Sequence, residues 1–192
     1  MIKGKTRKTT WRAIYRLLNM VSPMPFDCGG VCGAACCQAE DGLGMYLLPG
    51  EEKIHHKKDG WLSWEKHSTR EYDFPPSWHG EALFVNCRGP ENCRRELRPM
   101  QCRTFPLKPV IIEKSEEAAS YSIVYLKEGS PLALIYNNDP LPYCCPLIES
   151  RSALDPSYIR ATYIVWKHLI RDPLIYDLIK SNSSHRVRTD AE

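Results

Sequence analysis

Hydrophobic residues recur with a helical period near the start of the chain and again near its end. The first run predicts a helix that begins at Thr10 and stops before Pro23, with its apolar stripe at Trp11, Ile14, Leu18 and Val21. Two later helices are predicted to begin at Pro156 and Pro173, because each proline follows an aspartate that can cap the first turn. From Ser181 onward we expect a polar, frayed tail.

Short apolar runs between these helices predict strands. Residues 107–112 and 121–126 are rich in Val, Ile and Tyr and flank a polar segment, which predicts an antiparallel hairpin. Further strands are expected at residues 61–64, 82–86 and 132–136. The expected fold is therefore α+β: a single compact domain with terminal helices around an irregular, cysteine-rich centre and a small antiparallel sheet.

Within this domain the pattern divides the chain into three parts that pack together. Residues 1–24 form a basic tail and the first helix, residues 25–150 form the cysteine-rich part, and residues 151–192 form the C-terminal helices and tail. The 192 residues carry 26 Lys plus Arg against 23 Asp plus Glu, a net charge of +3. No apolar stretch reaches the roughly 20 residues of a membrane span, and no signal-type segment follows the N-terminus. We therefore expect a cytoplasmic protein without a membrane partner.

Cysteine is the unusual component, with nine residues in three tight groups. Cytosolic thiols stay reduced, so the odd number and the two adjacent pairs favour metal ligation over disulfides. Spacings of two to four residues bring neighbouring sulfurs within reach of one ion. Eight thiolates would fill two four-sulfur sites, so we expect more than one ion. The groups are Cys28, Cys32, Cys36 and Cys37, then Cys87, Cys93 and Cys102, then Cys144 and Cys145.

Arginines accompany the second group. Five arginines and two glutamates lie between Cys87 and Phe105. A divalent ion with four thiolates has a net charge of −2, which nearby cations stabilise. A solvated basic face is the alternative, and nucleic-acid binding is less favoured because the total charge is small and paired zinc-finger histidines are absent. The histidines at positions 55, 56, 67 and 79 are expected at the surface.

One segment resembles a known family. The run Arg98-Pro99-Met100-Gln101-Cys102-Arg103-Thr104-Phe105-Pro106 follows a Cys-Cys motif at 36–37 and the pair Cys87 and Cys93. This order is similar to the YkgJ-type cysteine cluster proteins, which are described as zinc- or iron-chelating domains. The resemblance spans roughly residues 28–150, and Cys144-Cys145-Pro146 stands where family members often carry a further Cys-Pro.

The resemblance implies a set of ligands and a cofactor. The cofactor would be zinc or iron, with a 4Fe-4S cluster as one form of the iron, and Arg98 and Arg103 would lie beside it. Either Cys144 or Cys145 could be the late ligand, and we favour Cys145. The implied ligands are Cys28, Cys32, Cys36, Cys37, Cys87, Cys93, Cys102 and Cys145.

The sequence leaves several functions open. The first is a redox or metal-binding module that works with a redox partner. The second is an iron-sulfur-dependent enzyme acting on a protein substrate, because the flagellin lysine methylases share this cluster region. A zinc-stabilised nucleic-acid adaptor and a reactive-thiol enzyme are less favoured.

Overall fold

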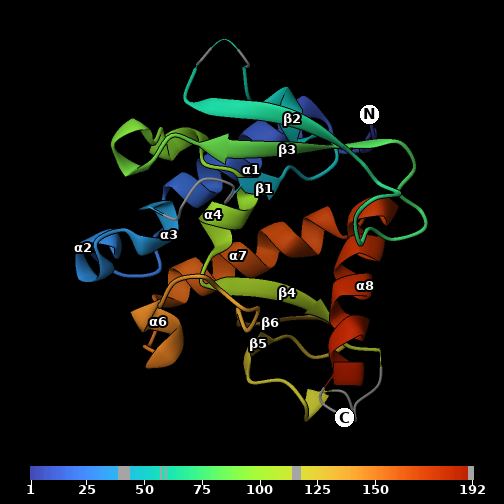
Figure 1. Cartoon of the computed structure of the whole chain (residues 1–192). Coiled ribbons are helices and arrows are strands. Elements are labelled where there is room, and N and C mark those ends of the chain that lie inside the picture. The colour runs from blue at the N-terminus through green and yellow to red at the C-terminus, as the bar shows by residue number, and fades with distance from the viewer. Residues whose placement is uncertain (39–43, 57, 59, 114–117, 190–192) are drawn as a thin grey trace.

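The computed structural model describes residues 1–38, 44–56, 58, 60–113 and 118–189, with side chains in the last helix described as far as Ser183. The elements confirm the predicted α+β class, in one compact domain (Figure 1). The helices are α1 (Lys8–Asn19), α2 (Gly29–Cys32), α3 (Ala35–Gln38), α4 (Met100–Thr104), α6 (Pro146–Glu149), α7 (Pro156–Leu169) and α8 (Pro173–Thr189). Single 3-10 turns are η1 (Glu51–Lys53), η3 (Pro90–Asn92) and η4 (Arg95–Leu97).

The strands form two three-stranded antiparallel sheets rather than one. The first sheet has the order β1-β3-β2 and the second has the order β4-β6-β5. The predicted hairpin was wrong in its pairing, because β6 lies between β4 and β5. Part of the segment expected to connect that hairpin, residues 114–117, lies outside the described residues. The strands are β1 (Gly44–Tyr46), β2 (Leu62–Ser68), β3 (Glu81–Cys87), β4 (Leu107–Ile111), β5 (Ile123–Leu126) and β6 (Leu132–Tyr136).

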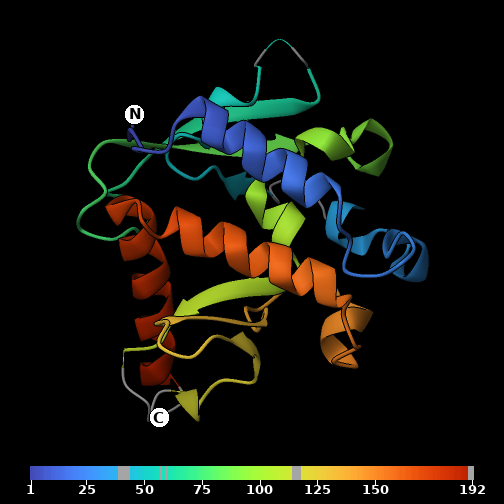
Figure 2. The same ribbon diagram turned by 180° about the vertical axis from the view of Figure 1, so that it is seen from behind.

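The long helices α1 and α7 pack against each other through their apolar faces. Helix α1 buries Trp11, Ile14 and Leu18 as its period predicted, and it packs against α7 (Figure 2). Asp155 caps α7 by accepting hydrogen bonds from the backbone N–H groups of Ser157 (2.7 Å) and Tyr158 (3.4 Å). The tail predicted from Ser181 onward was wrong, since α8 continues to Thr189.

The main hydrophobic core joins the second sheet to the helices. Leu107, Leu132 and Leu134 of this sheet contact α1, α7 and α8 through one continuous cluster. The first sheet has a smaller core of its own, made of Leu47, Trp61, Leu62, Leu83 and Val85. Helix α4 lies between the two sheets (Figure 1). Among the described helices, none has the length and apolar character that a membrane crossing requires.

Candidate metal centre

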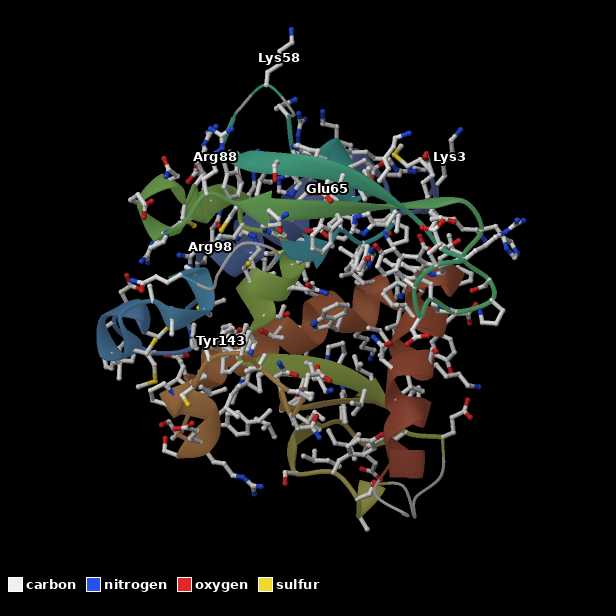
Figure 3. The ribbon with its side chains drawn as sticks, viewed as in Figure 1. Lys3, Lys58, Glu65, Arg88, Arg98 and Tyr143 are labelled. Carbon is white, nitrogen blue, oxygen red and sulfur yellow. The ribbon has the colours of Figure 1, made fainter. Side chains whose placement is uncertain are left out.

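Five of the predicted ligands line one cavity of about 710 Å³. They come from two distant regions of the chain, residues 36–37 and residues 87–102, and Arg98 and Met45 line the same space. Figure 3 shows Arg98 and Tyr143, another lining residue, on the side of the molecule that carries α2, α3 and α6. The five thiols are those of Cys36, Cys37, Cys87, Cys93 and Cys102.

Local backbone structure explains how these segments turn toward the cavity. Gly33 (φ 62°) and Ala34 (φ 58°) both adopt the left-handed conformation between α2 and α3, which ends the first short helix before Cys36. Gly89 (φ 89°) turns the chain after β3 and leads to η3 and Cys93. Cys102 lies in the middle of α4, the short helix that follows Pro99.

The Cys102 thiol is desolvated and lies beside a second sulfur. Its Sγ lies 3.4 Å from the Sδ of Met45, on β1. Burial, together with the nearby charges of Cys37 and Cys87, raises the pKa of Cys102 to about 12, although the charge of Arg98 opposes the shift. Without a bound cation this sulfur is therefore protonated at neutral pH, and binding a metal there would release its proton.

Arg98 is the cation that reaches the thiols. Its Nε donates to the Sγ of Cys93 at 3.0 Å. The Sγ atoms of Cys36 and Cys37 are 3.9 Å apart. Hydrogen bonding from Cys36 and the charges of Arg98 and Arg95 together lower the pKa of Cys37 to about 6, against the opposing effect of burial. The same sulfur–sulfur contact raises the pKa of Cys36. The site therefore contains one thiol that ionises readily and a guanidinium that stabilises the resulting charge.

Arg103 has a different position from the one that the sequence suggested. Its Nη1 donates to Oδ1 of Asn19 (2.6 Å), and its other nitrogens donate to the backbone carbonyls of Arg98 (2.5 Å) and Arg95 (3.3 Å). Its guanidinium carbon lies 4.1 Å from the centre of the Tyr15 ring. Arg103 thus braces the chain around the cavity instead of pointing at a thiol.

Three of the cysteines outside the cavity lining interact electrostatically, since the charges of Cys32 and Cys145 act on Cys28. Cys28 and Cys145 both pack against the main core. Burial raises the pKa of Cys28, and the charges of Asp27, Cys32 and Cys145 add to this effect. Cys144, in contrast, is exposed, and a hydrogen bond with Glu149 raises its pKa. Of the two late cysteines, Cys145 therefore faces the other thiols.

The thiols that line the cavity are ligands of the kind that a soft metal prefers, although their sulfur atoms do not surround a single point. Within the described residues, no three His, Cys, Asp or Glu side chains form a closed metal-binding group. The five thiols nevertheless line one cavity together with the guanidinium of Arg98. Thiolates are the preferred ligands of zinc and of iron-sulfur clusters. Of these five, Cys37, Cys87 and Cys93 also lie close enough for their charges to act on Cys102.

Sequence reasoning missed a buried polar network behind α4. Glu51 is 1% exposed and its carboxylate accepts a hydrogen bond from the hydroxyl of Tyr15 (2.6 Å). That hydroxyl also lies 3.0 Å from Nε2 of His55. The surface prediction for His55 was wrong, since this residue is 6% exposed. The Glu-Glu pair at 51–52 looks like a solvated turn, and only the helical phase of Tyr15, next to Ile14 and Leu18, hinted at a buried partner.

The comparisons with known proteins identify no relative. A scan against protein families finds no match for this chain, and searches of curated proteins and of solved structures also find none. The resemblance of the Arg98–Pro106 segment to YkgJ-type proteins therefore stays a prediction based on the residue pattern.

Proposed function

We propose that this chain is a cysteine-cluster metalloprotein that holds zinc, iron or a 4Fe-4S cluster and serves as a metal-binding or redox module. One observation carries the proposal: five thiols from two distant regions of the chain, residues 36–37 and 87–102, line the same cavity, where Arg98 donates to one of them. Clustered thiols without a metal repel one another once ionised, and a bound cation removes that repulsion.

The proposed ligands fall into two sets. Cys36, Cys37, Cys87, Cys93 and Cys102 would supply the first centre, from which a four-sulfur shell can be chosen. Cys28, Cys32 and Cys145 would contribute to a second centre beside it. When bound, the metal would supply either structural cross-linking or electron transfer. Arg98 would then offset part of the negative charge of the thiolates.

A second candidate is an enzyme that acts on a substrate at the thiol centre. The observation that favours it is the set of residues that line the cavity, which includes residues of β4 and Leu178 and Asn182 of α8 as well as the thiols. A volume of about 710 Å³ lies in the range of organic ligand sites, which is roughly 300–1,000 Å³. A protein-modifying reaction of the flagellin lysine methylase type belongs to this class.

Metal content of protein purified without oxygen tests the proposal. We expect zinc or iron in at least a 1:1 ratio in the native chain. Cys102→Ser should lose metal, because a hydroxyl that stays protonated replaces a thiolate ligand. Cys144→Ser is the matched control, since Cys144 is exposed and bonded to Glu149, and it should keep the native content. Native protein without zinc or iron, or Cys102→Ser with full occupancy, would contradict the proposal.

A further inference from the structure

Glu51 connects three segments around the thiol cavity. Its Oε1 accepts hydrogen bonds from the Tyr15 hydroxyl (2.6 Å) and the Met100 N–H (2.7 Å), and its Oε2 accepts one from the Leu48 N–H (2.9 Å). Burial raises the pKa of Glu51, and its three donors and the charge of Arg103 oppose that shift. Burying a carboxylate is unfavourable unless such donors surround it. These donors come from α1, from α4 and from the chain that follows β1.

The first branch from Glu51 leads to Cys102. Met100 is the first residue of α4, so its hydrogen bond to Glu51 fixes the start of the helix that carries Cys102. Leu48 follows the strand that contains Met45, whose sulfur contacts Cys102 at 3.4 Å. The helix that carries Cys102 and the segment after β1 are therefore both hydrogen-bonded to the Glu51 carboxylate.

The second branch leads to Cys93 through two arginines. The Tyr15 ring, bonded to Glu51, packs against the guanidinium of Arg103. The Nε of Arg103 donates to the carbonyl of Arg98, whose own Nε donates to the Cys93 sulfur at 3.0 Å. A continuous series of contacts thus joins the carboxylate to the second thiol.

We propose that Glu51 is the positioning residue of the thiol centre: through Met100 it fixes Cys102, and through Tyr15 and Arg103 it fixes Arg98, the donor to Cys93. The expectation that Glu51 also raises metal affinity rests on the proposed function. The expectation that Glu51 fixes the positions of Cys93 and Cys102 does not rest on it, and it can be tested in protein without metal.

Alkylation rates of the individual cysteines test this placement. Reduced, metal-free protein is treated with iodoacetamide, and each cysteine is followed by mass spectrometry relative to the exposed Cys144. Glu51→Gln should raise the rates of Cys93 and Cys102 by about fivefold, the factor that corresponds to about 1 kcal/mol for one lost hydrogen bond. Tyr15→Phe removes only the second branch and should raise the rate of Cys93 more than that of Cys102.

Thr69→Val is the matched control. It removes a buried hydroxyl that donates to the carbonyl of Trp78 (2.9 Å), away from the thiols, and it should change none of the cysteine rates. Unchanged rates of Cys93 and Cys102 in folded Glu51→Gln would overturn the proposal, as would an equal rise at the other eight cysteines relative to Cys144. If Glu51→Gln does not fold, an unchanged alkylation rate of Cys93 in Tyr15→Phe would overturn the proposal.

Cobalt(II), used alone as the probe, provides the second readout. Glu51→Gln should weaken Co²⁺ binding by roughly 10–100-fold and alter its thiolate charge-transfer absorption, as expected when a group that orients ligands is lost. Thr69→Val should bind as the native protein does. Native Co²⁺ affinity in Glu51→Gln would overturn the metal part of the inference. If the native protein binds no Co²⁺, the mononuclear form of the proposed metal site fails, and the alkylation rates still decide the role of Glu51.

Discussion

Arg98 and Arg103 belong to one sequence motif but have opposite surroundings. Arg98 donates to a thiol, and its charge acts on Cys37 and Cys102. Arg103 donates to two backbone carbonyls and to Asn19, and it packs on Tyr15. The family resemblance implied that both residues lie beside a cofactor, since a sequence motif does not reveal the direction of its side chains. Only the folded structure separates the arginine that acts on sulfur from the arginine that braces the backbone.

Replacing Arg98 should make Cys37 harder to ionise. A neighbouring cation stabilises the thiolate and lowers its pKa, so Arg98→Gln should move the pKa of Cys37 upward from about 6 toward its ordinary value of 9.0. Once the pKa lies above the working pH, each further rise by one lowers the thiolate fraction about tenfold. The measurement is the pH profile of Cys37 alkylation in metal-free protein.

A neighbouring arginine provides the control for this profile. Arg94 pairs with Glu96 at 3.2 Å, whereas the arginine charges that lower the pKa of Cys37 are those of Arg98 and Arg95. Arg94→Gln should therefore leave the profile unchanged. Identical profiles for Arg98→Gln and the native protein would remove Arg98 from the description of the thiol centre.

The elements differ in how well the sequence predicted them. Helices α7 and α8 begin at the predicted prolines because the Asp-Pro pair supplies both the cap and a suitable first residue. The hairpin prediction failed because apolar content identifies strands without identifying their partners. The run at Leu132–Tyr136 is buried at four consecutive positions, and this continuous burial suits the central strand of a sheet better than its edge.

The N-terminal cap of α7 predicts how a substitution at Asp155 changes the stability of the protein. The Asp155 carboxylate accepts from two backbone N–H groups, and its hydrogen bonds with Ser157 lower its pKa below 3.8. Asp155→Ala should lower the melting temperature at pH 7 by roughly 2–4 °C, whereas Asp155→Asn, which keeps an acceptor, should lower it less.

The pH dependence of this cap follows from the direction of the shift. Since the folded pKa is below the unfolded value, the carboxylate contributes fully above pH 3.8, and its contribution is lost as the pH falls through the folded pKa. The difference between native protein and Asp155→Ala should therefore be constant near neutrality and shrink below pH 3.8. Thermal melts from pH 7 to pH 3 measure it, and a difference that grows toward low pH would contradict the cap.

At the scale of the whole molecule, the fold brings together what the sequence could only group. Spacing placed Cys36 and Cys37 in one group and Cys87 and Cys102 in another, but it did not show that the two groups share a cavity. The hydrogen bond between Cys144 and Glu149 also required the structure. Glu51 was not predicted, because a carboxylate in a polar turn carries no sequence signal of burial.

X-ray absorption at the metal edge of the native protein, purified without oxygen, tests the central claim most directly. The thiols that line the cavity predict a coordination shell made of sulfur, at about 2.3 Å from zinc or at the comparable distance from iron. A shell composed only of nitrogen and oxygen, at about 2.0–2.2 Å, would contradict a cysteine-ligated metal centre.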